Sequence, residues 1–460
     1  MVENTTIYPV KDFILAEGMP ADARLALADC LAVWYSNLAR NLERYKYYEG
    51  ENRLKDFGIS TPPELLHTNT VIGWPNKAVM AVALRSRYDG AAAENAETQQ
   101  QLRAIERRSR LATKYRQAVE SELVYGCSFA IVGLDDKGKS RIEFYDAEHA
   151  AGVWDDARGR IAYGCVFDVN TNGGIERIRL FMDDATYTIE RTGTGAAMSW
   201  TAEPHGMGRC CMEALAYRPT LKKPLGQSRI SHAVMSITDA AVRCALGGDI
   251  SFQFAVAPQK YILGADPEAL DGMSKWEAYI GNIFGIGYNG DADKMPQFGQ
   301  LSQASMQQYV DYMRSLAARF SGETDVPVSQ LGIIHDNPSS AQAIYAATEP
   351  LVLAVDDLNN NSRQALEQLL TMALAAERGI AFDEVQEEVS VSFANPSTPS
   401  VVTMADSAVK LAAAVPAFAG TTQFWKMMGV ADDVRRQIEA QTDKAAALKL
   451  LDSLNGGADA

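Results

Sequence analysis

The sequence lacks the motifs by which zinc sites and hydrolase sites are usually recognised. It contains no G-x-S-x-G turn, and none of its five histidines stands at H-x-x-x-H or H-E-x-x-H spacing. A zinc hydrolase needs several ligands on one face of its fold, and an α/β-hydrolase needs its serine on a strand-to-helix turn. We therefore predict no catalytic residue, no metal site and no cofactor, and we do not expect an enzyme.

The sequence also has few cysteines and a deficit of basic residues. The six cysteines include no C-x-x-C pair, which disfavours a zinc site or a disulfide framework and favours folding in a reducing cytosol. Lys and Arg number 43 against 58 Asp and Glu, which gives a net charge of -15. Isolated DNA-binding proteins usually carry the opposite sign, so any contact with nucleic acid is expected to be local or weak.

Long apolar runs are missing as well. Charged residues, Gly or Pro interrupt every apolar stretch well before about 20 residues, the length that a membrane-spanning helix needs. The chain does not begin with a positively charged segment followed by an apolar one, as a signal peptide would. We predict a protein that is made in the cytoplasm and has no membrane span.

Apolar residues at helical spacing predict several helices along the chain. The expected ranges are 22–48, 69–88, 97–123, 228–254, 303–320, about 339–377 and 402–454. Pro350 predicts a kink in the long helix that begins near residue 339. Gly247 and Gly248 weaken the helix 228–254, each by roughly 1 kcal/mol relative to alanine.

Between residues 128 and 191 the apolar pattern changes to that of strands. The expected strands are 128–134, 141–145, 161–168, 175–182 and 186–191, with a later short one at 389–393. Turn residues separate them, and Asp135-Asp136-Lys137-Gly138 is interpreted as the turn of the first hairpin. Helices followed by a run of adjacent strands predict an α+β fold with a mainly antiparallel sheet.

Two patterns in the Gly- and Asp-rich stretch 259–300 superficially suggest ligand sites. Residues 284–290 resemble a phosphate-binding loop, but they lack its third spaced glycine and its setting between a strand and a helix. Asn289, Asp291 and Asp293 alternate as in a calcium loop, but other residues occupy its glycine and terminal glutamate positions. We interpret both patterns as turns.

Eight short segments are more informative in their order than any of them is alone. They are 47–53 (Tyr-Tyr-Glu-Gly-Glu-Asn-Arg), 76–79 with Arg85, 125–130 (Tyr-Gly-Cys-Ser-Phe-Ala), 154–159, 226–230 (Gly-Gln-Ser-Arg-Ile) with 238–241, 257–264, 337–344 with Glu349, and 395–399 with Asp406 and Lys410. In this order, and from about residue 45 to 450, the sequence resembles the portal proteins of long-tailed bacteriophages.

The resemblance implies a ring-forming portal fold with an α/β wing, an α-helical stem, a small α/β clip and an α-helical crown. The wing would be 1–222 and 339–394, the stem helices would lie in 223–257 and 302–338, the clip would be 258–301, and the crown would be 395–460. The segment 302–338 would also carry the tunnel loop, at about 331–338.

The resemblance also implies function and partners. A homo-oligomeric ring, usually of twelve subunits, would stand at one capsid vertex of the virion, after assembly in the host cytoplasm. It would conduct double-stranded DNA without reading its sequence, during both packaging and ejection. It would dock the large subunit of the terminase and later a head–tail adaptor, and it would meet the major capsid and scaffolding proteins and nucleate procapsid assembly.

Candidate contact residues follow from the implied regions. In the tunnel loop, Ile333, Ile334, His335 and Asp336 would lie nearest the DNA. In the clip, the residues expected to contact the terminase or the adaptor are Asp266, Trp276, Tyr288, Asp291 and Asp293. An acidic channel lining would repel DNA and keep it centred, whereas many Lys contacts would hold it through counterion release.

The sequence departs from the family pattern at two places. Gly247-Gly248 falls inside a helix expected to be rigid, and Cys210-Cys211-Met212 stands where the family often has Val-Pro-Val. Two alternative functions stay open. A different head–tail connector or adaptor would be shorter and lack the helix–clip–helix–loop order, and a soluble cytoplasmic enzyme would show a convergent polar pocket and a small oligomeric state.

Overall fold

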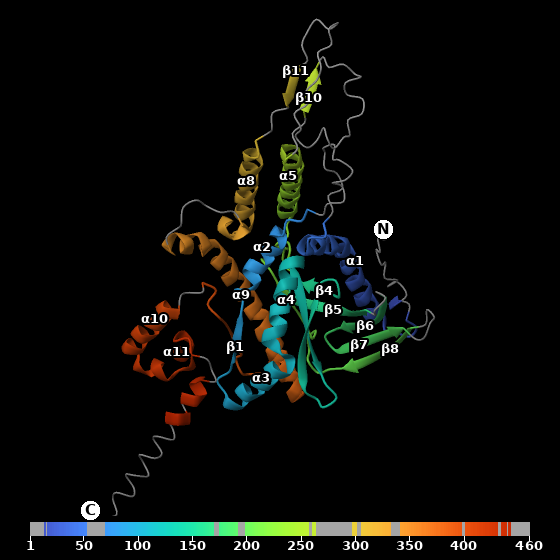
Figure 1. Ribbon diagram of the computed structural model, residues 1–460. Helices are drawn as coiled ribbons and strands as arrows, with labels where there is room; N and C mark the ends of the chain where they lie inside the picture. Colours follow the sequence, from blue (N-terminus) through green and yellow to red (C-terminus); the bar gives the residue numbers. More distant parts are fainter. Residues whose placement is uncertain are drawn as a thin grey trace, which may run out of the picture. The chain divides into compact units, whose positions relative to one another are not determined.

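The computed structural model describes residues 13–14, 16–52, 70–169, 174–191, 198–256, 260–263, 297–300, 305–332, 341–397, 401–430, 434–438 and 440–442. Contacts divide the chain into two compact units, Met1–Pro396 and Ser397–Ala460. The larger unit combines helices with antiparallel sheets, in agreement with the predicted mixture of the two (Figure 1).

One layer of the larger unit is a five-stranded sheet. Its order is β4 (Ala150–Asp155), β5 (Arg160–Val169), β6 (Ile175–Phe181), β7 (Ala185–Arg191) and β8 (Met198–Pro204), and every neighbouring pair is antiparallel. The β4–β5 hairpin turns where the Asp155 carboxylate accepts hydrogen bonds from the backbone N–H groups of Ala157 and Arg158. Strands β5 to β7 agree with the prediction, whereas β4 and β8 were not predicted as strands.

Helix α1 (Ala21–Glu49) covers this sheet and agrees with the predicted 22–48. Its apolar residues recur at helical spacing, so Leu27, Leu31 and Trp34 all face the strands and are buried. The ring of Trp34 lies 4.9 Å from that of Phe167 on β5, measured between centroids. Burial of this one apolar stripe fixes the helix on the sheet.

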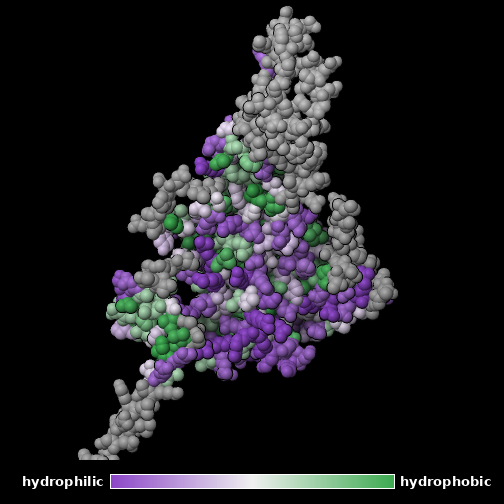
Figure 2. All heavy atoms as spheres, in the orientation of Figure 1, coloured by the Kyte–Doolittle hydropathy of each residue, from purple (hydrophilic) through white to green (hydrophobic). Residues whose placement is uncertain are grey.

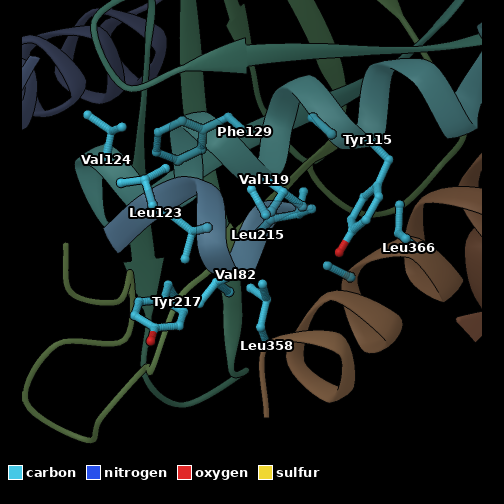
Figure 3. Close-up of a cluster of buried hydrophobic side chains, with 14 of the residues drawn as sticks. Val82, Tyr115, Val119, Leu123, Val124, Phe129, Leu215, Tyr217, Leu358 and Leu366 are labelled. Atoms are coloured by element: carbon cyan, nitrogen blue, oxygen red, sulfur yellow. The ribbon is translucent and has the colours of Figure 1, made fainter. Parts of the chain in front are cut away.

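The main core lies against a second sheet of three strands, β3 (Ser140–Asp146), β2 (Cys127–Leu134) and β9 (Met212–Ala216). Helices α2 (Trp74–Ala83), α4 (Leu111–Tyr125) and α9 (Ala341–Arg378) supply many of its other buried side chains. Figure 3 shows Val119 and Leu123 of α4 meeting Leu215 of β9 and Leu358 of α9. Segments more than 200 residues apart in sequence therefore share one core.

The predicted helix 97–123 is wrong in one respect, because the chain breaks at Arg110. Helix α3 (Ala96–Ser109) ends there, and Arg110 adopts the left-handed conformation with φ of 49° before α4 begins. Tertiary contacts hold the break: the Ser109 hydroxyl accepts a hydrogen bond from Ile142 N, and Arg108 Nε donates to the carbonyl of Ser140. These partners on β3 are not visible in the local pattern.

The predicted helix 69–88 is also too long. Helix α2 ends at Ala83, and Tyr88–Ala92 forms strand β1, which pairs antiparallel with β12 (Ser390–Phe393). Tyr88 stands opposite Phe393 in this register, and Ala92 stands opposite Ser390. The strand at 389–393 was predicted, but its partner was not.

Two helices, α5 (His232–Val256) and α8 (Gln307–Thr324), pack side by side (Figure 1). They agree with the predicted helices, but each begins about four residues later than expected. Strands β10 (Lys260–Leu263) and β11 (Gln297–Gln300) pair antiparallel between them in the sequence. We call α5 and α8 the helix pair.

The single turn η3 (Val328–Leu331) follows the helix pair, and α9 then runs for 38 residues, as predicted. Pro350 lies inside α9, and Figure 1 shows the helix changing direction near its beginning. The short turn η4 (Phe382–Glu384) precedes β12.

The smaller unit is helical where it is described. It contains α10 (Val401–Ala414), the turn η5 (Pro416–Gly420) and α11 (Thr422–Met427). The prediction of one helical tract over 402–454 missed the break before Pro416, whose ring cannot continue α10. Thr421 then caps α11 by accepting a hydrogen bond from Phe424 N.

Candidate functional site at the base of the helix pair

The chain enters the helix pair through residues 217–230, which we call the junction. Two glycines with positive φ meet there, Gly126 (φ 108°) after α4 and Gly226 (φ 78°) before α5. A Cβ added at Gly226 would collide with backbone atoms of Gly126 and Tyr217. One at Gly126 would lie 3.1 Å from the backbone of Gln227 and of Ser228. Only glycine permits the two segments to approach this closely.

Main-chain hydrogen bonds join the same segments. Tyr217 N donates to the carbonyl of Gly126 at 3.0 Å, and Gln227 N donates to the carbonyl of Tyr217 at 2.8 Å. Arg229 N donates to the carbonyl of Leu123 at 2.8 Å, and the Ser228 hydroxyl donates to that of Val124. The last turn of α4, whose carbonyls have no partner within the helix, is thus satisfied by the junction.

Arg229 is the central side chain of the junction and is only 7% exposed. Its Nε donates to the carbonyl of Ala78 on α2 at 2.6 Å, and Nη1 donates to the Tyr217 hydroxyl at 2.7 Å. Nη2 donates to the carbonyl of Thr324, the last residue of α8. A cation at a helix C-terminus is favourable because it faces the negative end of the helix dipole. One guanidinium therefore fixes α8 against α2 and the junction.

A second connection reaches the helix pair from α1. The Tyr47 hydroxyl lies 3.0 and 2.9 Å from the two carboxylate oxygens of Asp239 on α5, and Asn52 Nδ2 donates to the same carboxylate. Burial and this hydrogen bond raise the pKa of Tyr47 well above its usual value. The hydroxyl therefore remains protonated and can donate to Asp239.

Glycine also explains how the two helices of the pair approach each other. Tyr309 of α8 lies over Gly247, where an added Cβ would be 3.2 Å from its ring, and over Gly248. The Tyr309 hydroxyl is 2.7 Å from that of Ser251, and Cys244 Sγ donates to the Tyr309 carbonyl. The departure at Gly247-Gly248 thus has a local compensation, because the tyrosine occupies the space that the glycines leave.

The other departure, Cys210-Cys211-Met212, is compensated in the same way. All three side chains are buried, and Met212 stands on β9 opposite Ile131 of β2. A Cβ at Gly164 on β5 would collide with the Met212 sulfur, so the bulky methionine is matched by a glycine on the neighbouring sheet.

The outer faces of the helix pair carry large apolar side chains. Phe252 is 58% exposed on α5, and Val310 and Tyr312 are 45% and 51% exposed on α8. Figure 2 shows apolar (green) surface on this part of the molecule. Large apolar side chains left exposed on two neighbouring helices favour protein–protein contacts there.

One sequence pattern needed the structure for its interpretation. Gly133, Gly138, Lys139 and Ser140 stand at the spacing G-x-x-x-x-G-K-S of a phosphate-binding loop. The segment forms the β2–β3 hairpin, where the Asp135 carboxylate accepts from the N–H groups of Lys137 and Lys139. A strand follows it, not the helix whose N-terminus would bind phosphate. The predicted turn at 135–138 is confirmed, and Gly133 and Ser140 of the motif lie in the two paired strands.

Two of the described histidines, His149 and His205, have ordinary partners. His149 Nδ1 lies 2.8 Å from the Asp146 carboxylate, and this hydrogen bond raises the pKa of His149. His205 Nε2 lies 3.7 Å from Cys211 Sγ. Within the described part of the chain, no group of three His, Cys, Asp or Glu side chains could hold a metal ion. Nor is any helix described there long and apolar enough to cross a membrane.

The candidate contact residues named from the sequence lie outside the described residues. This holds for Ile333, Ile334, His335 and Asp336, and also for Asp266, Trp276, Tyr288, Asp291 and Asp293. Sequence reasoning did not single out Arg229, Tyr47 or Asp239 as contact residues, although all three belong to segments that carried the resemblance. Those segments meet at the junction, since Ala78, Gly126, Gly226 and Arg229 contact one another directly or through Tyr217.

The profile of the family "Phage portal protein, SPP1 Gp6-like" matches residues 27–447. The chain belongs to this portal family. Among its relatives, the portal protein of Mycobacterium phage D29 is 24% identical over 408 residues, which cover 85% of this chain and 82% of the relative. The portal protein of Mycobacterium phage L5 is 25% identical over 381 residues, with 79% and 77% covered.

Two solved structures also resemble this portal protein. A chain from the neck of an empty GTA particle, computed with C6 symmetry, has a TM-score of 0.48 at 14% identity and covers 82% of this chain and 95% of its own length. A chain from the neck of a native GTA particle, computed with C12 symmetry, has a TM-score of 0.41 at 14% identity, with 78% and 90% covered. As a portal protein, the chain is a structural component of phage assembly.

Proposed function

We propose that copies of this portal protein form a homo-oligomeric ring of about twelve at one capsid vertex, with a central channel for double-stranded DNA. The helix pair carries the proposal. Its helices pack on each other through Gly247 and Tyr309, yet Phe252, Val310 and Tyr312 stay exposed on the outside. Neighbouring copies around an axis would bury these faces, because a heterologous contact that closes on itself generates a ring.

The regions follow from the same proposal. The α5–α8 pair would be the stem, the segment 258–301 between its helices the clip, and 331–338 the tunnel loop. The sheets, with α1 to α4 and α9, would be the wing, and residues 395–460 the crown. The compactness of Ser397–Ala460 as a unit of its own supports a separate crown.

The partners are likewise part of the proposal. The clip would dock the large terminase subunit during packaging and a head–tail adaptor afterwards, while the wing and crown would face the major capsid and scaffolding proteins. The net charge of -15 suits a channel. Basic side chains would bind the DNA by releasing its condensed counterions, whereas an acidic wall repels the DNA and lets it slide past. The ring would act without a catalytic site of its own.

The first experiment is the mass of the purified protein by light scattering, followed by electron-microscopy class averages. A ring predicts a mass near twelve times 50.1 kDa and averages with a central hole. A monomer of 50.1 kDa at all concentrations would contradict the proposal.

The channel is tested by the tunnel loop. Replacing both His335 and Asp336 with Lys adds positive charge where the DNA is proposed to pass, so packaging or ejection should slow. Intact rings that package and eject at the unchanged rate would remove these residues from the channel.

A further inference from the structure

A cavity of about 400 Å³ lies between α1, the junction and the start of α5. Arg40 and Arg44 line it from α1, Lys223 from the junction and His232 from the first turn of α5. No Asp or Glu occurs among its described lining residues. A cavity whose described lining has three cations and no carboxylate is unexpected in a chain with a net charge of -15.

The positions of the two arginines reduce the stability of α1. They stand one helical turn apart, and like charges at this spacing destabilise a helix. Neither forms an ion pair with any residue that the structure describes. The pKa of Arg44 is lowered to about 10 by burial and then by the charge of Arg40. An anion placed between the two guanidinium groups would remove this repulsion.

Arg44 also has an unused donor. Its Nη1 donates to the carbonyl of Tyr125, but its Nε is enclosed and has no hydrogen-bond partner among the described atoms. A buried donor without a partner costs about 1–3 kcal/mol, more when it is charged. The 25-residue helix α5 also begins at this cavity, where the Ser231 hydroxyl accepts a hydrogen bond from Val234 N. The positive end of its helix dipole therefore faces the same cavity.

The rim of the cavity points to a protein as the source of the anion. Next to Lys223, the tight turn closed by hydrogen bonds between Thr220 and Lys223 carries Leu221, which is fully exposed at its tip. A free ion would not cover this leucine, whereas a protein surface would bury it and supply a carboxylate. Copies with a charge of -15 repel one another, so their contacts need places where cations meet carboxylates.

We infer that this cavity receives an acidic side chain from a second copy of the chain, so that Arg40, Arg44 and Lys223 form an inter-subunit ion-pair site. The inference rests on the proposed ring and names one of its contacts. It places an electrostatic contact beside α1, separate from the apolar faces of α5 and α8.

The first test is chemical cross-linking of rings mixed from ¹⁵N-labelled and unlabelled copies. A carbodiimide joins an amine to a carboxylate only where the two are in contact. The expected product links Lys223 to an Asp or Glu of the other isotope. A ring in which Lys223 is linked only within its own copy, or not linked, would overturn the inference and leave the ring standing. Failure of the wild-type protein to form rings would overturn both.

The second test uses two double variants with the same change of charge. Arg40→Glu with Lys223→Glu reverses two exposed cations of the cavity, and Arg24→Glu with Arg103→Glu reverses two exposed cations elsewhere. The concentration for half-assembly, measured by mass photometry, should rise about tenfold or more for the first and less than about threefold for the second. Equal effects would overturn the inference.

Circular dichroism of both variants should match the wild type, since none of the four residues is buried.

Inorganic phosphate distinguishes a free oxyanion from a neighbouring carboxylate. If phosphate binds the assembled wild-type ring and not the cavity variant, the cavity is open in the ring and the inference fails. The expected result is no phosphate binding to the assembled ring, because a side chain fills the cavity.

Discussion

The junction and the helix pair are consecutive in the chain, yet they are held in opposite ways. The junction is saturated: Arg229 uses three nitrogens on three separate partners, and Gly226 has no space for a single methyl group. The helix pair is packed on one side only. Its two helices are in close contact at Tyr309, but Phe252 and Tyr312 on the outside are exposed. The comparison teaches that one copy alone completes the buried contacts around Arg229 and Gly226, whereas the outer faces of the helix pair stay uncovered in a single copy.

The largest effect is expected at Gly226. Gly226→Ala places a Cβ against backbone atoms in a left-handed conformation, so the free energy of unfolding should fall by about 4 kcal/mol. The matched control is Gly322→Ala in α8, where a Cβ would meet nothing within 4 Å and should add up to about 1 kcal/mol. Thermal unfolding followed by circular dichroism measures both. Equal shifts in melting temperature for the two variants would contradict the view that the junction is the more tightly packed region.

Arg229 should give the next largest effect. Arg229→Met keeps the length of the side chain but leaves the carbonyls of Ala78 and Thr324 without a donor, at a cost of about 3 kcal/mol. Arg319→Met on an exposed face of α8 is the control and should change stability by less than about 0.5 kcal/mol. Denaturant titration gives both values. A loss under 1 kcal/mol at Arg229 would show that the junction does not depend on this side chain.

The junction side of the molecule should also respond to pH. Glu122 of α4 is fully buried, and neither of its carboxylate oxygens has a partner among the described atoms. Burial raises its pKa well above the usual value, so the folded protein keeps the proton that the unfolded chain releases. The stabilisation from this retained proton is fully present below about pH 4.5. As the pH rises from there toward the folded-state pKa, the free energy of unfolding falls by about 1.4 kcal/mol per pH unit.

Glu122→Gln removes that dependence. The variant should gain stability over the wild type as the pH increases from 5 to 8, and the two should converge in acid. Melting temperatures across this range test it, with the exposed Glu43→Gln as the control. Parallel curves for Glu122→Gln and the wild type would mean that the carboxyl finds a partner when ionised.

The smallest effect on stability is expected in the helix pair. Gly247→Leu forces the Tyr309 ring away from α5 and should cost about 1–2 kcal/mol, whereas Gly322→Leu meets open space. Assembly should suffer more than folding, because the outer faces of the pair would no longer match a neighbour. Mass photometry beside thermal unfolding separates the two effects, and a variant that melts earlier but assembles normally would contradict this view.

Much of the fold follows from local pattern, and the exceptions have a common cause. Helix α1 and the strands β5 to β7 carry their own periodicity, so the sequence predicts them within a few residues. Strand β1 and the break at Arg110 depend on partners about 300 and 30 residues away. No local window contains those partners.

The site was predictable only in part, and for a related reason. The segments around Gly126 and Gly226 were recognisable, but nothing in either one shows that their backbones touch. Arg229 lies in a recognised segment, but its role was not predictable, since a buried arginine is identified by its acceptors, and these lie on α2, at Tyr217 and at the end of α8. The contact residues of the proposed tunnel loop and clip remain predictions.

The pairing of β1 with β12 constrains how the protein is made. Tyr88 leaves the ribosome early, but its partner Phe393 follows some 300 residues later. At a typical synthesis rate of about 5–20 residues per second, β1 waits for tens of seconds with an unpaired edge. A nascent chain of this kind is exposed to premature association with its copies, and a host chaperone that shields residues 88–92 would raise the yield of assembly-competent subunits.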